Sequence, residues 1–233
     1  MYKQIILIAF ILLISNVRVI PQSLNTLTGL YNIPSAEVMG DGQASFGAFY
    51  LSRNFFTKYQ TFNENAIEYF GAIGFLPFLE LSVHFTKNLA PNDALGDRTF
   101  NLKIKAIEEK EFIPAIAIGI HDPIHTEENP TNHYNSLYIV TTKNIIINNS
   151  FVNKIAVTNG YGSDIIKAAT YQYIGYFGGV SLTVIHFVNL MAEYDADRFN
   201  GGIRVCLFNH INILAGWGGF SYFMGGASFM WKL

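Results

Sequence analysis

The segment from Val188 to Phe208 shows a pattern that recurs through the chain: apolar and polar side chains alternate on both sides of a short turn. A period of two is the signature of a β-strand, because successive side chains point to opposite faces of a sheet. The segment therefore predicts a β-hairpin with one apolar face. Its other face carries Glu193, Asp195 and Arg204, which need water or one another.

The same alternation predicts about twelve strands in total, within a range of about 10 to 14. The strand segments are 43–51, 67–75, 79–86, 100–106, 115–120, 134–143, 151–158, 175–182, 188–195, 202–208, 211–217 and 226–233. Long and short connections alternate between them, as in outer-membrane barrels with long outer loops and short periplasmic turns. We therefore expect an all-β fold, an antiparallel up-and-down transmembrane β-barrel with both termini on the short-turn side.

Composition excludes several other classes of protein. Half of the 233 residues are hydrophobic and 14 % are charged, so the chain is too apolar to be disordered. After residue 20, no apolar run reaches the roughly 18 residues that a membrane-spanning helix requires. A net charge of -2 gives no basic surface for nucleic acid, and the single Cys206 supports neither a disulfide framework nor a thiolate metal cluster.

The two ends of the chain carry their own signals. Lys3 is followed by the apolar run Ile5 to Ile14, which is typical of a secretory signal peptide; an uncleaved N-terminal anchor is the alternative. We expect residues 1–23 to be a cleaved signal peptide and residues 24–233 to form a single outer-membrane β-barrel domain. The last predicted strand stops at Leu233, so it can pair with the first strand and close the barrel.

The charged residues expected to face the lumen form a structural network rather than an active site. Its members are Glu68, Glu80, His84, Lys103, Lys105, Glu193, Asp195, Arg204 and Lys232. Acids and bases nearly balance, so cross-strand ion pairs that fill a modest lumen are favoured over a selective channel. Bulky Phe70, Met191, Phe208 and Met230 are expected on the same side, which also favours a filled interior.

Candidate catalytic and metal-binding patterns are weak. His121 and His125 are four residues apart, but Pro123 between them argues for a loop rather than a helix that would put both on one face, so no metal site is expected. Ser82 and His84 would need a fixed acid beside them to act as a hydrolase, and we expect no catalytic residues.

Two glycine-rich segments, GYFGGV at 175–180 and GWGGF at 216–220, could suggest phosphate loops. Neither opens a helix after a strand, so we expect their glycines to allow tight turning or curvature of the sheet. No cofactor is expected.

Four segments carry a resemblance to a known family: TGLYNIPSAEVMGDGQ, GDRTFNLKIKAIEEKEFIPAIAIGIHDPI, SLYIVTTK and LMAEYDADRFNGGIRV. They resemble the YjbH-like family of exopolysaccharide biosynthesis proteins. The resemblance implies an outer-membrane β-barrel that works with capsule or exopolysaccharide assembly factors, and it supplies no catalytic residues. Longer members hold more than one barrel-like portion, so this single barrel is expected to keep the membrane scaffold without the whole export function.

These observations lead to one functional expectation. The chain is expected to be a non-enzymatic protein of the outer membrane of a Gram-negative bacterium, supporting exopolysaccharide or capsule biosynthesis and export as a scaffold or accessory component. The expected partners are outer-membrane lipids, exopolysaccharide assembly proteins and the polysaccharide, without nucleic acid. The alternatives are an outer-membrane enzyme acting on lipid or glycan, a small diffusion pore and a soluble β-sandwich binding module.

Overall fold

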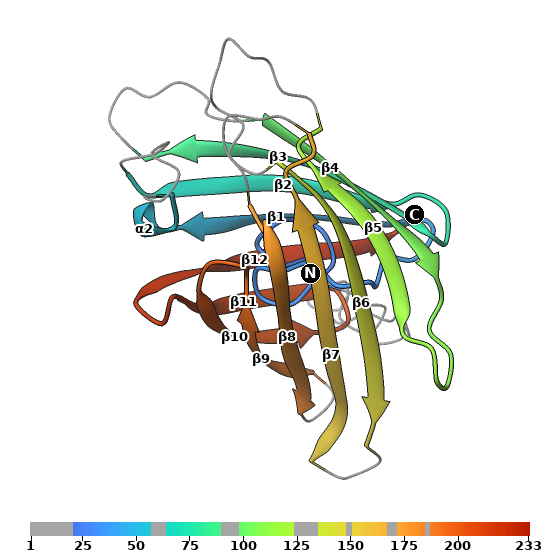
Figure 1. Cartoon of the computed structure of the whole chain (residues 1–233). Helices are drawn as coiled ribbons and strands as arrows, with labels where there is room; N and C mark the ends of the chain where they lie inside the picture. The colour runs from blue at the N-terminus through green and yellow to red at the C-terminus, as the bar shows by residue number, and fades with distance from the viewer. Residues whose placement is uncertain are drawn as a thin grey trace.

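The protein is a closed barrel of twelve antiparallel strands, in which consecutive strands pair and β12 pairs with β1 (Figure 1). The computed structural model describes residues 21–56, 64–89, 98–123, 135–147, 151–166, 172–184 and 187–233. The strands are β1 (Gln43–Leu51), β2 (Ala66–Gly74), β3 (Leu79–Asn88), β4 (Arg98–Ile107), β5 (Ala115–His121), β6 (Ser136–Ile146), β7 (Val152–Ser163), β8 (Gly175–Val184), β9 (Val188–Tyr194), β10 (Phe199–Leu207), β11 (Ile211–Gly218) and β12 (Tyr222–Lys232); one short helix, α2, spans Arg53–Phe56.

The predicted fold class is therefore confirmed, and every predicted strand segment overlaps a strand. Several boundaries differ. β12 begins at Tyr222 rather than near residue 226, because residues 222–225 continue the pairing with β11; β7 runs to Ser163 rather than residue 158, and β10 begins at Phe199 rather than residue 202. Phe208 was expected inside but lies in the β10–β11 turn and is exposed. The proposed signal peptide falls almost entirely outside the described residues.

The barrel closes between its first and last strands. Gln43 pairs with Lys232 and Tyr50 with Gly225, and the Leu233 amide donates a hydrogen bond to the carbonyl of Gly42 over 2.6 Å. Closure removes both sheet edges, which would otherwise present unpaired backbone groups. Among the described residues, no helix is long and apolar enough to cross a membrane.

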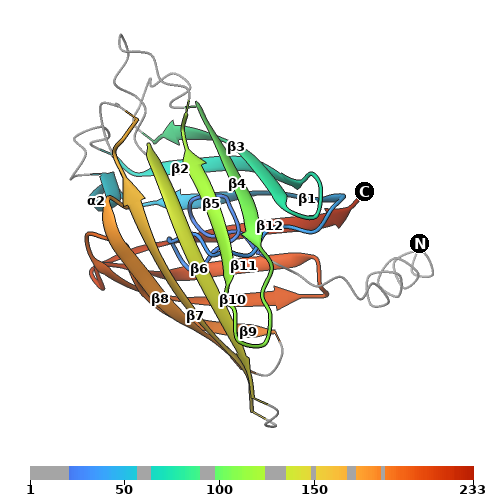
Figure 2. The same ribbon diagram turned by 45° about the vertical axis from the view of Figure 1, so that its right-hand side comes forward.

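The two ends of the barrel differ in their connections. At the short-turn end the strands are joined by residues 75–78, 108–114, 147–151, 185–187 and 208–210, and the chain ends there at Leu233. The opposite end, which we call the long-loop end, has the connections 52–65, 89–97, 122–135, 164–174, 195–198 and 219–221. Figure 2 shows the strands tilting between these two ends.

Alternation along the strands separates a buried inner face from an apolar outer face. On β3, Glu80 and Ser82 are buried, whereas Val83 and Phe85 are each close to half exposed. Outward-facing Phe46 and Ile104 extend the apolar surface to other strands. The buried charges of the wall thus lie inside the barrel, where they share the inner face with apolar side chains such as Phe49, Leu214 and Met224.

The lumen is not empty, because the chain before β1 fills it. We call residues 22–39 the plug; nearly all of them are buried, and Leu27, Tyr31, Ile33 and Met39 have no exposed surface. The plug meets the wall again at Gly42, whose amide donates to the carbonyl of Gly74. The interior is therefore a protein core made of a coil inside a barrel.

Candidate functional site

The plug is an irregular coil held in shape by its own backbone. Bridges join Gln22 to Thr28 and Gly29 to Pro34, and the amide of Leu24 donates to the carbonyl of Tyr31. These bonds satisfy only part of its backbone, so the remaining amides and carbonyls need partners on the barrel wall. Buried charged side chains of the wall supply those partners.

Glu193 on β9 binds consecutive amides of the plug. Its carboxylate accepts hydrogen bonds from the backbone amides of Tyr31 (3.0 Å), Asn32 (2.8 Å) and Ile33 (3.3 Å). A carboxylate that accepts several amide bonds can remain charged although it is buried. Glu193 therefore orients the middle of the plug through the three amide hydrogen bonds that its side-chain oxygens accept.

Arg204 on β10 binds carbonyls of the same plug. Its guanidinium donates to the carbonyl oxygens of Gln22 (3.0 Å), Gly29 (3.1 Å) and Leu30 (2.6 Å). Arginine suits this role because its planar fork presents several donors at once. Arg204 thus ties together two stretches of the plug that are separated in sequence.

Glu80 and Lys103 hold the plug from the opposite strands, β3 and β4. They are direct neighbours in the strand register, and Lys103 Nζ lies 3.1 Å from Glu80 Oε2, with neither side chain exposed. Lys103 also donates to the Thr28 carbonyl over 2.7 Å, while Glu80 accepts from the Thr28 amide and hydroxyl, both over 2.8 Å. One plug residue is therefore bound by both members of a buried ion pair.

Asp195, at the end of β9, extends the Glu193 site toward the long-loop end. Its carboxylate accepts from the side-chain amides of Asn32 (3.0 Å) and Asn200 (2.8 Å). Tyr173 donates its hydroxyl to the Asn32 carbonyl over 2.9 Å. Asn32 is consequently held on both its side chain and its backbone.

Glu68 and His84 line the remaining space in the lumen. His84 Nε2 lies 3.6 Å from Glu68 Oε2, and His84 Nδ1 lies 3.3 Å from the hydroxyl of Thr26 in the plug. Together with His121 they border a cavity of about 10 Å³ between plug and wall. That is the room of about one water molecule, so no sugar ring fits there while the plug is in place.

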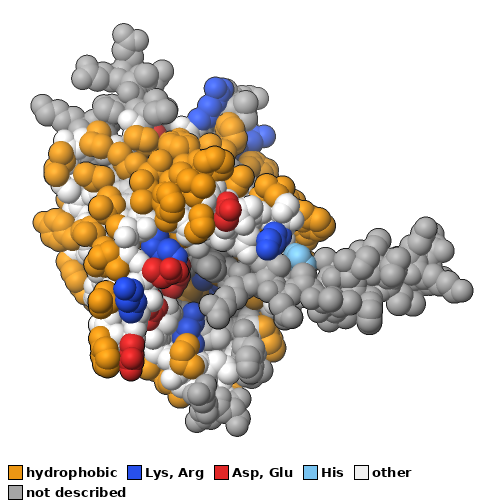
Figure 3. Space-filling view, turned by 90° about the vertical axis from the view of Figure 1, so that its right-hand side faces the viewer, with side chains coloured by type: hydrophobic (Ala, Val, Ile, Leu, Met, Phe, Trp, Pro, Cys, Tyr) orange, Lys and Arg blue, Asp and Glu red, His pale blue; other side chains and the backbone are white. Residues whose placement is uncertain are grey.

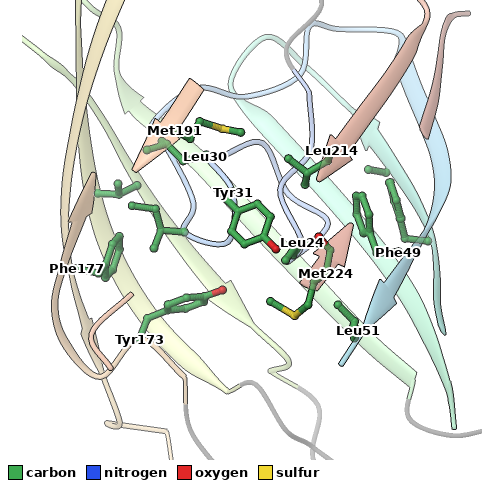
Figure 4. Close-up of a cluster of buried hydrophobic side chains, with 14 of the residues drawn as sticks. Leu24, Leu30, Tyr31, Phe49, Leu51, Tyr173, Phe177, Met191, Leu214 and Met224 are labelled. Carbon is green, nitrogen blue, oxygen red and sulfur yellow. Dashed lines mark hydrogen bonds between the residues drawn. The ribbon is translucent and has the colours of Figure 1, made fainter. Parts of the chain in front are cut away.

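The apolar side chains of the plug pack against the wall around Tyr31, which lies at the centre of the cluster in Figure 4. The Tyr31 hydroxyl donates to the Met224 carbonyl over 3.0 Å, and burial raises the pKa of this phenol well above its ordinary value. A Cβ added to Gly202 or Gly216 would lie 2.5 Å or 2.7 Å from the Tyr31 ring. The glycine at 216, which we expected to allow curvature of the sheet, makes room for the plug.

Two of the predicted lumen residues lie near the short-turn end. Lys105 is partly buried and pairs with Glu108 of the β4–β5 turn over 3.3 Å. Lys232 is exposed, because it is the last residue of β12 and lies at the barrel rim. The prediction of lumen charges was therefore wrong for Lys232.

The structure places the other seven predicted residues in or at the edge of the lumen, and all seven are buried: Glu68, Glu80, His84, Lys103, Glu193, Asp195 and Arg204. Sequence reasoning paired them with one another across strands, whereas most bind the plug. The plug itself was missed. One signal could have revealed it: Leu24, Leu27, Leu30 and Ile33 recur every three residues in a segment interpreted as a lead-in to the first strand.

A further polar group connects the plug to the short-turn end. The side-chain amide of Asn144 donates to Glu37 of the plug (2.8 Å) and to Glu109 of the β4–β5 turn (2.5 Å). Lys143 pairs with Glu109 over 3.0 Å. Burial alone would raise the pKa of Glu109, but its bonds to Asn144 and Lys143 outweigh burial and leave that pKa below its ordinary value.

The metal-binding and hydrolase patterns of the sequence can be compared with the described part of the structure. No group of three or more His, Cys, Asp or Glu residues there is disposed to hold a metal ion. His125 and its neighbouring acids lie outside those ranges. The Ser82 hydroxyl contacts Thr26 over 2.8 Å, so the plug covers it.

Comparison with known families gives one match. The model of the YjbH family, described as exopolysaccharide biosynthesis protein YbjH, matches residues 22–174. The chain belongs to this family. The match covers more than half of the 233 residues, and it begins at the first residue of the plug.

No curated protein matches the chain. The YjbH match ends at residue 174, before β8, so it includes the Glu80–Lys103 pair but not Glu193 or Arg204. The plug and the Glu80–Lys103 pair that binds it therefore lie within the part of the chain that the family model matches.

Proposed function

We propose that this YjbH-family protein is an outer-membrane β-barrel that supports exopolysaccharide assembly as a closed, non-enzymatic scaffold. The observation that carries this proposal is the plug, which is bound by charged wall residues on two sides of the lumen. A conducting pore would need a continuous water-filled path, and the described interior contains a packed core instead.

The outer surface supports the membrane part of the proposal. Large apolar side chains point outward from all parts of the barrel, including Phe46, Ile118, Ile139, Leu190 and Ile213, each more than a third exposed. Exposed apolar surface on this scale is unfavourable in water, whereas it matches the lipid-facing band of an outer-membrane barrel. Tyr161, Tyr176 and Trp217 near the long-loop end suit an interfacial aromatic girdle.

The family supports the biological part of the proposal. Membership links the chain to exopolysaccharide biosynthesis. Because the plug blocks the lumen, the polymer would pass through a partner, and this barrel would hold assembly proteins at the outer membrane. Outer-membrane lipids and exopolysaccharide assembly proteins are the partners that this role requires.

Three measurements test the proposal. The protein should fractionate with the outer membrane, migrate faster in SDS gels before boiling than after it, and give no steady conductance in planar bilayers. In cells, deletion of the gene should reduce surface polysaccharide, and the wild-type gene should restore it. A stable open conductance would overturn the scaffold in favour of a pore, and unchanged polysaccharide would overturn the role in its assembly.

A further inference from the structure

The turns at the short-turn end carry large apolar side chains where a water-exposed turn would carry polar ones. In the β2–β3 turn, Phe75 is 56 % exposed and Phe78 is 47 % exposed. In the β4–β5 turn, Phe112 reaches 87 %. These residues lie beyond the strands, so the alternation of the outer wall does not account for them.

The apolar residues come from turns all around this end. Ile146 and Phe151 border the β6–β7 turn, and Phe187 and Phe208 lie in the next two turns. The β4–β5 and β6–β7 hairpins extend beyond the neighbouring wall (Figure 1). A protein partner would occupy one patch, whereas a lipid leaflet surrounds a barrel on every side, so a ring of apolar turns favours lipid.

Lysines accompany the acids at this end. Glu109 pairs with Lys143 and Glu108 pairs with Lys105, while Glu108 and Glu111 of the same turn remain exposed. Figure 3 shows hydrophobic side chains on this end beside a compact group of Lys/Arg and Asp/Glu side chains. Lys110 and Lys232 are exposed and can reach phosphate groups while their stems lie along apolar surface.

We infer that the short-turn end is immersed in a glycerophospholipid leaflet, with the turn tips at the acyl boundary and the lysines at the phosphates. This inference rests on the proposed membrane location and adds that the short turns lie within the lipid rather than in the water beyond it. The β4–β5 and β6–β7 hairpins, which a hydrogen bond between Asn144 and Glu109 joins, would then set the depth of the barrel in the membrane.

Tryptophan fluorescence tests the inference on the full chain. In a background of Trp217→Phe and Trp231→Phe, three single tryptophans are compared: Phe112→Trp at a turn tip, Ile104→Trp on the outer wall and Glu64→Trp at the exposed long-loop end. Each variant is reconstituted into vesicles of phosphatidylethanolamine and phosphatidylglycerol with brominated acyl chains. Phe151→Trp provides a second turn position in case one variant folds poorly.

We expect Phe112→Trp and Ile104→Trp to lose most of their emission to the brominated chains, and Glu64→Trp to be quenched instead by acrylamide in the water. If Ile104→Trp is quenched by lipid but both turn tryptophans respond only to acrylamide, the turns lie in water and the inference is overturned. If Ile104→Trp also escapes the brominated lipid, the proposed membrane location itself fails, and the inference fails with it.

Discussion

The two sides of the lumen hold the same plug in different ways. On the β3–β4 side, Glu80 and Lys103 form an ion pair with each other and then bind Thr28. On the β9–β10 side, no ion pair within 4.0 Å joins Glu193 to Arg204 among the described residues, and each binds plug backbone. Without the plug, Glu80 and Lys103 would still have each other as charge partners. Glu193 and Arg204 would instead lose most of their hydrogen-bond partners.

Removal of the plug, residues 22–39, should reduce the stability of the barrel more than any other change, because both sides of the lumen lose the segment they bind. The deletion leaves Glu193 and Arg204 without their plug partners. It also removes buried apolar side chains such as Leu27, Tyr31 and Ile33, and burial of each such side chain contributes about 1.5–3 kcal/mol to stability. We expect loss of the SDS-resistant folded band that unboiled samples of the full chain should show. A synthetic peptide of residues 22–39 is the control and should restore part of it; a fully stable truncated barrel would contradict the dependence.

Arg204→Met should have the next largest effect, a loss of about 3–5 kcal/mol in the free energy of unfolding. Three plug carbonyls lose charged hydrogen bonds that contribute about 1.5–3 kcal/mol each, and we expect neighbouring groups to replace part of this contribution. Urea unfolding in detergent micelles measures it. Lys232→Met removes a charge at the exposed rim and is the matched control, expected to change stability by less than about 0.5 kcal/mol. Equal losses in the two variants would mean that Arg204 is solvated.

Double-mutant cycles compare the two sides directly. Glu80→Gln and Lys103→Met should couple by about 2 kcal/mol, because the side chains form a fully buried pair. Glu193→Gln and Arg204→Met should couple by less than about 1 kcal/mol, because each acts mainly through its own plug contacts. The reverse order of coupling would show that the β9–β10 charges interact directly.

Gly202→Ala should lower the free energy of unfolding by about 1–3 kcal/mol through overpacking, less than Arg204→Met. The added methyl group would press on the Tyr31 ring, so Tyr31→Leu should relieve part of the loss when the two are combined. Gly71→Ala is the matched control, since an added Cβ there has no neighbour within 4 Å. An identical cost at Gly71 would indicate a backbone effect rather than contact with the plug.

The strands could be predicted from the sequence because their signal is local. Alternation with a period of two depends only on a strand having two faces, and even the bounds of β1, Gln43–Leu51, follow from it. The inward parity of Glu80, Lys103, Glu193 and Arg204 follows from the same rule.

The site could be predicted only in part, because the plug follows neither the helical nor the strand period. Its apolar residues recur every three positions, and its contacts join residues far apart in the chain. Alternation also says nothing about where a strand reaches the barrel rim, which is why Lys232 was placed in the lumen. The expected domain boundary after residue 23 falls inside the plug, since Gln22 and Ser23 already make its contacts.

The distance in sequence between the plug and β9–β10 also shapes how the molecule folds. Their hydrogen bonds join residues 160 to 182 positions apart, so the plug is synthesised long before the strands that bind it. Contacts of such high sequence separation form slowly, and apolar segments that await them are prone to aggregate. The last strands therefore complete two events: they seal the sheet and supply the plug with its remaining partners, so we expect barrel closure and completion of the core to be coupled.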